Sequence, residues 1–207
     1  MLFLFLALFA ALLTLPVRSD GSLRILAIGD SLTAGYGLEQ GDGLVPQLQR
    51  WLDANGAAAV EVVNMGASGD TTAGGRARLD WVLTDGADAV ILALGANDML
   101  RGIEPTESRG NLDAMLATLN ARGLPVLLIG MEAPRNYGPG YKDAFDAIYP
   151  ELAGKYGTLL DSHFLAGLVD EPTLFQDDGL HPNAAGVAMM VDRLGPIVLD
   201  LIARVER

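Results

Sequence analysis

The sequence predicts an α/β fold in which helices cover both faces of a five-stranded parallel sheet, a three-layer α/β/α sandwich. Short apolar runs alternate with longer amphipathic stretches along the 207 residues, and this alternation is typical of βαβ units. The short runs are rich in Val, Ile and Leu with little polar alternation, as expected for strands buried on both faces. The length fits one domain, and we expect right-handed crossovers between the strands.

Each predicted strand is a short apolar run, and together the strands are residues 24–28, 60–64, 89–94, 126–129 and 158–160. The predicted helices are residues 44–54, 72–83, 106–121, 141–156 and 184–205. Ordinary end signals support several of them. Asn55-Gly56 follows the first helix, Arg122-Gly123 follows the third, and Asn183 is placed to cap the last.

Composition excludes several classes of function. The net charge of −12 argues against a nucleic-acid partner and against electrostatic docking on anionic lipid. The chain has no cysteine, which excludes disulfides, cysteine-based zinc sites and a cysteine nucleophile. The glycines form no dinucleotide or P-loop fingerprint. Composition says nothing positive about the substrate, and we expect a monomer.

The N-terminal stretch is almost wholly apolar. Residues 1–17 are shorter than the roughly 20 residues that a membrane span needs, and small residues follow Pro16 where a signal peptidase cuts. We predict a signal peptide over 1–19, a domain over 20–207, export to the periplasm or beyond, and no stable membrane partner after cleavage. No Lys or Arg precedes the apolar run, so an uncleaved anchor and a misassigned start codon remain alternatives.

Polar residues follow the predicted strands where each strand ends. Ser31 comes after the first strand, Gly69 after the second and Asn97 after the third, while residues 177–182 precede the last helix. Ligands of open α/β sheets bind outside the carboxyl ends of the strands. These residues are therefore expected to share one cleft.

Their types match the needs of acyl transfer. Ser31 is a candidate nucleophile and His181 its base, with Asp178 three residues before the histidine to orient the ring. The Ser31 N–H, the Gly69 N–H and the Asn97 side-chain amide are candidate donors to an oxyanion. Asp177 is an alternative to Asp178. Activity is expected to fall on acidification, because the base must be neutral.

Each of these residues, taken alone, also has a purely structural or alternative explanation. Ser31 can cap a helix, and Gly69 or Asn97 can belong to ordinary turns. Only two histidines occur, so a local Ser162–His163 pairing is the alternative base, without a companion oxyanion site. A metal site from Asp177, Asp178 and His181 would lack a second histidine. No serine has the Gly-x-Ser-x-Gly context of an α/β-hydrolase.

Four sequence blocks together resemble those of the SGNH, or GDSL, hydrolases. They are Gly29-Asp30-Ser31-Leu32, Ser68-Gly69-Asp70-Thr71, Gly95-Ala96-Asn97-Asp98 and Asp178-Gly179-Leu180-His181-Pro182-Asn183. They occur in the family's order and span essentially the whole predicted domain. The chain is most similar to the bacterial branch of multifunctional acyl-CoA thioesterase, lysophospholipase and arylesterase, although Ala96 stands where that branch often has glycine.

The resemblance implies a flavodoxin-like SGNH fold and a periplasmic, cofactor-free serine hydrolase of carboxylic esters or thioesters. It implies Ser31, His181 and Asp178 as the catalytic triad, with Gly69 and Asn97 as oxyanion donors. Residues 132–138 are similar to the branch's mobile substrate-binding loop.

By position, we expect substrate contacts from Leu100, Ile103, Pro134 and Tyr137 and an acyl group of short or medium length. A catalytically silent flavodoxin-like binding module is the alternative function, because a parallel sheet of this kind hosts many ligands.

Overall fold

The centre of the molecule is a five-stranded sheet in which every strand runs parallel, in the order β2-β1-β3-β4-β5. We describe residues 22–205 of the chain in a computed structural model. The strands are β1 (Leu23–Gly29), β2 (Val60–Gly66), β3 (Ala89–Ala93), β4 (Val126–Ile129) and β5 (Leu159–Asp161). The predicted sheet is thereby confirmed, with strand ends that differ from prediction by at most two residues.

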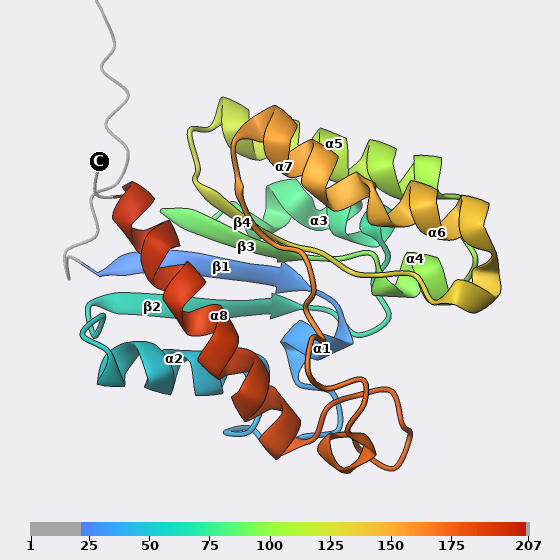
Figure 1. Ribbon diagram of the computed structural model, residues 1–207. Helices are drawn as coiled ribbons and strands as arrows, with labels where there is room; N and C mark the ends of the chain where they lie inside the picture. The colour runs from blue at the N-terminus through green and yellow to red at the C-terminus, as the bar shows by residue number, and fades with distance from the viewer. Residues whose placement is uncertain (1–21, 206–207) are drawn as a thin grey trace, which may run out of the picture.

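Helices cover both faces of this sheet, which confirms the three-layer prediction (Figure 1). Helices α2 and α8 pack against each other on one face, and α3, α5 and α7 lie on the opposite face. The longer helices are α2 (Leu44–Ala54), α3 (Thr72–Val82), α5 (Pro105–Ala121), α6 (Pro139–Asp146), α7 (Ile148–Tyr156) and α8 (Ala184–Val205). The short elements, which the sequence analysis missed, are α1 (Ser31–Ala34), α4 (Ala96–Leu100) and two 3₁₀ turns at Arg135–Tyr137 and Pro172–Leu174.

The single helix predicted over 141–156 is wrong, because the structure has two helices that meet at Ala147. Pro150 explains the division. A proline has no N–H to donate to the carbonyl four residues earlier, here that of Asp146. Helix α6 therefore ends at that residue, and it begins at Pro139, whose fixed φ suits a first helical turn.

The strands form the densest part of the core. Every residue of β3 and β4 is buried, and so are the last five residues of β1. This explains their unbroken Val, Ile and Leu character, because a central parallel strand has no solvent-facing side. Buried strands hold their carboxyl ends in fixed positions, and so the first residues of the loops that start there are fixed as well.

The strand order changes direction between β1 and β3. The chain passes from β1 outward to β2 and then returns to the other side of β1 to form β3. Such a switch point opens a crevice at the carboxyl edge of the sheet. Ser31 follows β1 and Asn97 follows β3, so both lie at this crevice.

The predicted signal peptide falls on residues 1–19, outside the described residues. Within residues 22–205, no helix combines the length and the apolar character needed to cross a membrane.

Candidate active site

Ser31 is held at the point where β1 turns sharply into α1. The Asp30 side chain caps this short helix, because its Oδ1 accepts a hydrogen bond from the Leu32 N–H at 3.0 Å. Gly29 is required just before the turn, since a Cβ built there would lie 2.0 Å from the Thr33 hydroxyl. The serine is thereby fixed at the edge of the sheet rather than on a free loop.

His181 and Asp178 reach Ser31 from the loop that precedes α8. His181 Nε2 lies 2.9 Å from Ser31 Oγ, and His181 Nδ1 lies 2.7 Å from Asp178 Oδ2. The second Asp178 oxygen accepts the backbone N–H groups of Leu180 and His181, each at 2.9 Å. A carboxylate favours a histidine whose Nδ1 carries the proton, which leaves Nε2 free to accept from a serine hydroxyl.

The hydrogen bonds to Asp178 favour its charged form. The His181 backbone N–H, the His181 ring and the Leu180 N–H together lower the pKa of Asp178 from 3.8 to about 2. The carboxyl group is therefore ionised throughout the neutral range although its side chain is 40% exposed. The ring bonds to Asp178, not to the neighbouring Asp177 that the sequence left as an alternative.

Two further contacts hold the loop against the body of the domain. The Gln176 side-chain amide donates to the Tyr36 carbonyl at 2.9 Å and to the Pro182 carbonyl at 3.0 Å. The Tyr36 ring packs on the His181 ring with centroids 4.8 Å apart. The histidine is thus braced by a neighbour that sequence reasoning did not single out, five residues after Ser31.

Asn97 enters the crevice from a glycine turn after β3. Gly95 has φ +123°, a conformation open to glycine, and a Cβ there would meet the Tyr149 hydroxyl at 2.1 Å. The Asn97 amide donates to the Asp70 carbonyl at 2.9 Å and to Asp30 Oδ2 at 3.3 Å. Both of its hydrogens therefore have protein acceptors, and the longer bond is the one to Asp30.

Gly69 occupies the loop after β2 with φ +83°. Its carbonyl accepts a hydrogen bond from the Arg101 guanidinium at 2.8 Å. Within residues 22–205, the Gly69 N–H donates to no protein acceptor. Ser31, Gly69 and Asn97 all line the same cavity, so the structure brings together the three residues that the sequence suggested as oxyanion donors.

Two buried carboxyl groups support this side of the site. Asp98 is 1% exposed and accepts from the Thr72 N–H at 2.8 Å, the Thr72 hydroxyl at 2.5 Å and the Ser108 hydroxyl at 3.1 Å. It thereby joins α4, which carries Asn97, to the starts of α3 and α5. Asp30, also 1% exposed, has its pKa raised from 3.8 to about 6 by burial, against opposing effects of the Leu32 N–H and His181.

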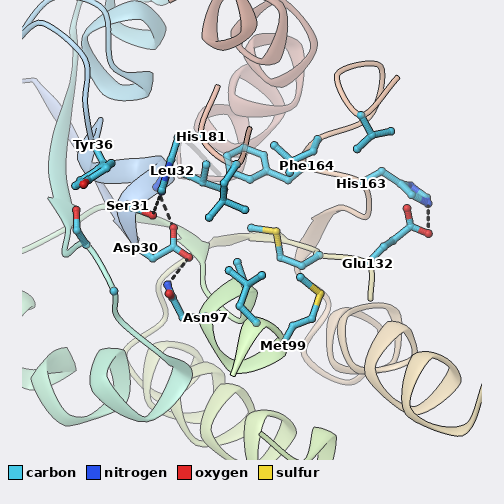
Figure 2. Close-up of a pocket in the computed structure, with 18 of the residues that line it drawn as sticks. Asp30, Ser31, Leu32, Tyr36, Asn97, Met99, Glu132, His163, Phe164 and His181 are labelled. Carbon is cyan, nitrogen blue, oxygen red and sulfur yellow. Dashed lines mark hydrogen bonds and ion pairs between the residues drawn. The ribbon is translucent and has the colours of Figure 1, made fainter. Parts of the chain in front are cut away.

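An apolar cleft of about 350 Å³ opens beside Ser31. Its apolar lining consists of Leu32, Ala96, Met99, Leu100, Met131, Phe164, Leu165, Ala166, Val169 and Leu180. Figure 2 shows His181 and Ser31 on one side of this cleft and His163 and Glu132 on the other, with Leu32 and Phe164 between them. The arrangement suits an extended apolar ligand with one reactive end.

The four predicted substrate contacts lie in different places. Leu100 lines the cleft, but Ile103, Pro134 and Tyr137 are not among its lining residues. Tyr137 stacks on Tyr141 with centroids 5.0 Å apart, and the Tyr141 hydroxyl donates to the Ile103 carbonyl at 2.9 Å. These contacts place Tyr137 and Ile103 in a neighbouring cluster, outside the cavity.

Two residues that follow β4 and β5 line the cleft, although the sequence analysis considered them in other roles. Glu132 and His163 come shortly after these two strands and line the cleft. The family resemblance placed Glu132 in the substrate-binding loop, and His163 was considered only as a partner of Ser162. The strand-end rule that found Ser31, Gly69 and Asn97, applied to the last two strands, places both residues at the cleft.

The alternative pairing of Ser162 with His163 is also present. Ser162 Oγ lies 2.8 Å from His163 Nδ1, and His163 Nε2 lies 3.6 Å from Glu132 Oε1. Ser162 itself is not among the residues that line the cleft. Within residues 22–205, no group of three or more acidic or histidine side chains is arranged to hold a metal ion.

Known proteins share both the sequence and the fold. Residues 27–189 match the GDSL-like Lipase/Acylhydrolase family. The chain is 37% identical over 191 residues to Esterase TesA of Pseudomonas aeruginosa, which covers 92% of this chain and 94% of that protein. It is 36% identical over 195 residues to Thioesterase 1/protease 1/lysophospholipase L1 of Escherichia coli K12, with 94% and 92% covered.

A solved structure agrees with these relatives. AlinE4, described as an SGNH-hydrolase family esterase, is 44% identical with a TM-score of 0.74, and the match covers 86% of this chain and 96% of AlinE4. The chain therefore belongs to the GDSL-like lipase/acylhydrolase family and is an ester-hydrolysing enzyme.

Proposed function

We propose that the protein is a serine esterase or thioesterase that works through an acyl-enzyme on Ser31. The observation that carries this proposal is the continuous hydrogen-bonded chain from Ser31 Oγ through His181 to Asp178 at the mouth of an apolar cleft. A nucleophile, a base and a group that orients the base are in reach of one another before any substrate binds. The relatives named esterase, arylesterase and thioesterase support the same class.

In the first half of the reaction, Ser31 Oγ attacks the carbonyl carbon while its proton passes to His181 Nε2. Asp178 stabilises the resulting imidazolium through Nδ1. The tetrahedral intermediate collapses when Nε2 returns this proton to the departing alcohol or thiol. The acyl group then remains as an ester of Ser31.

In the second half, a water molecule takes the place of the leaving group. His181 accepts its proton as the water attacks the acyl-enzyme, and later returns a proton to Ser31 Oγ. The products are the free acid and the restored serine. These proton transfers use only the side chains of Ser31, His181 and Asp178, which are already in contact.

The tetrahedral oxyanion needs donors that are already in place. The Ser31 and Gly69 N–H groups are two candidates, and the Asn97 amide is the third. Asn97 already donates to Asp30 and Asp70, so we propose that the oxyanion shares or takes over the hydrogen that makes the longer bond to Asp30. This donor is worth roughly 3 kcal/mol or more when measured by removal in comparable sites.

We propose that the acyl group occupies the apolar cleft, with Leu100 among its contacts. Ile103, Pro134 and Tyr137 are proposed to contact only larger substrates that extend beyond the cavity. The proposed export of residues 20–207, after removal of 1–19, would place this reaction in the periplasm or outside the cell, with the enzyme as a monomer.

The test is Ser31→Ala, with Ser162→Ala as the matched control because Ser162 also bonds to a histidine. We expect Ser31→Ala to lose p-nitrophenyl acetate hydrolysis by at least a factor of about 10⁴ and to lose covalent labelling by a fluorophosphonate, with unchanged thermal unfolding. Ser162→Ala should retain both. Equal labelling of the Ser31→Ala protein would overturn the proposal.

A further inference from the structure

The cleft beside Ser31 ends in a polar pair at the side remote from the nucleophile. Glu132 and His163 both line the cleft, and their charged or titratable groups face each other at 3.6 Å. Figure 2 draws this pair on the opposite side of the cleft from Ser31 and His181. The residues between the two ends include Leu32, Met99 and Phe164, all apolar. A ligand that fills the cleft would therefore have one end at Ser31, its middle along an apolar wall and its other end at the Glu132–His163 pair.

The backbone around His163 is anchored by two other parts of the chain. The Gly130 N–H donates to the Asp161 carbonyl at 2.6 Å, and the Phe164 N–H donates back to the Gly130 carbonyl at 3.2 Å. Arg193 of α8 donates to Asp161 Oδ1 at 2.5 Å and to the Phe164 carbonyl at 2.6 Å. The segment after β5 is thus tied to the segment after β4 and to α8.

The segment that carries Glu132 is fixed by α6. The Ala133 N–H donates to Asp146 at 2.8 Å, and the Ala133 carbonyl accepts from Lys142 Nζ at 2.8 Å. Lys142 also bonds Asp146 at 2.6 Å and lies 4.0 Å from Glu132. The polar end of the cleft is therefore built by secondary structure on both sides, although the Glu132 and His163 side chains are 52% and 55% exposed.

The chemistry at Ser31 decides which part of a substrate lies along this wall. The leaving group must sit next to His181 Nε2, because this atom returns the proton to it. Figure 2 shows the apolar wall leading away from His181 toward His163. The part of the substrate that extends along the wall is then the acyl chain, whose far end approaches the polar pair.

We propose that Glu132 and His163 form the polar end of the acyl-binding slot and limit the apolar acyl chain that the enzyme favours to medium length. This inference rests on the proposed acyl-enzyme function. Each methylene that covers apolar wall should raise kcat/KM by about fourfold. A methylene that reaches the pair gains no apolar contact and removes water from polar groups, so the benefit ends there.

The test measures kcat/KM for straight-chain p-nitrophenyl esters from acetate to laurate and compares the longest with acetate. This ratio is independent of the amount of folded enzyme. In the wild-type protein the ratio should rise with chain length, level off and then fall. In His163→Phe, which keeps a ring of similar shape but removes its polarity, the plateau should move to longer chains, with a gain in the laurate-to-acetate ratio of about tenfold.

His163→Gln is the matched control, because it keeps polarity and changes shape. We expect its plateau at the wild-type chain length. The inference would be overturned if kcat/KM of His163→Phe levelled off at the wild-type chain length, because another residue would then limit the acyl chain. An equal shift in both variants would also overturn it, because side-chain shape and not polarity would then set the limit.

Failure of the underlying function gives a different result: ester hydrolysis would be undetectable in the wild-type protein or would persist in Ser31→Ala.

Discussion

The two sides of the Ser31 site are stabilised in opposite ways. Ser31 and Asn97 stand at the ends of buried strands, supported by Asp30 and Asp98, which are each 1% exposed. On the other side, His181 and Asp178 stand on a loop, and the Asp178 side chain is 40% exposed. On both sides, polar groups lie within hydrogen-bonding distance of each other. Only the strand side is buried in the core.

This difference separates stability from activity. A buried carboxyl group must be matched by donors or it weakens the fold, because desolvation opposes its charge. An exposed carboxylate contributes little to the fold through its ion pair, since water and salt screen it. Substitutions on the loop side should therefore change the reaction alone, and those on the strand side should change stability as well.

The largest effect is expected on the loop side. Asp178→Asn can keep its backbone hydrogen bonds, but its NH₂ group would face His181 Nδ1 and favour the tautomer protonated at Nε2. That nitrogen could then no longer accept the Ser31 proton, so kcat should fall by about 10⁴-fold. The melting temperature should stay within a degree or two of wild type, as measured by calorimetry alongside the kinetics. A variant that melts much earlier would show that the loop side supports the fold after all.

On the strand side, Asp98→Ala should mainly cost stability. It leaves the Thr72 N–H, the Thr72 hydroxyl and the Ser108 hydroxyl without their acceptor in the core. We expect the free energy of unfolding to fall by about 4 kcal/mol, measured by urea titration. Asp98→Asn keeps the volume and one acceptor oxygen, so its loss should be about half as large. Equal stability of wild type and Asp98→Ala would contradict the assigned role of this network.

The smallest expected effect is at Asp30, where a substitution should raise the free energy of unfolding and not lower it. Because burial raises the pKa of Asp30 from 3.8 to about 6, the folded protein binds this proton more tightly than the unfolded chain does. The stability linked to that proton is fully present below pH 3.8 and is lost as pH rises through about 6, a change of about 3 kcal/mol. Charged Asp30 therefore weakens the fold at neutral pH.

Asp30→Asn removes that cost. Relative to wild type, the variant should gain up to about 3 kcal/mol in free energy of unfolding between pH 4 and pH 7, as denaturant titrations at several pH values would measure. Its ester hydrolysis should fall, because the Asn97 amide loses a carboxylate partner. A pH-independent difference in stability between the two proteins would show that Asp30 is not held in a desolvated state.

Particular residues show which parts of the fold could be predicted from the sequence. The strands and most helices were predictable because buried parallel strands read as apolar runs, and because Asn55, Asn183 and nearby residues give end signals. The division at Ala147 was missed although Pro150 was visible. A proline disrupts a helix interior but fits a first turn, so Pro150 indicates a second helix that starts just before it. The short helices α1 and α4 lie within the functional turns themselves, where four or five residues give no detectable periodicity.

The sequence by itself determined the order of strands and helices along the chain, the family blocks, and Ser31 and His181 as two members of the hydrogen-bonded site, with Asp178 or Asp177 as the third. Local patterning is sufficient for this, because apolar period and turn chemistry are properties of neighbouring residues. Only the tertiary structure decided that Asp178 and not Asp177 meets the ring, that Asn97 shares its amide with Asp30, and that Glu132 and His163 end the cleft. The last two facts depend on loops that are 67 and 31 residues apart in the sequence and that the sheet brings together, and no local pattern encodes such contacts.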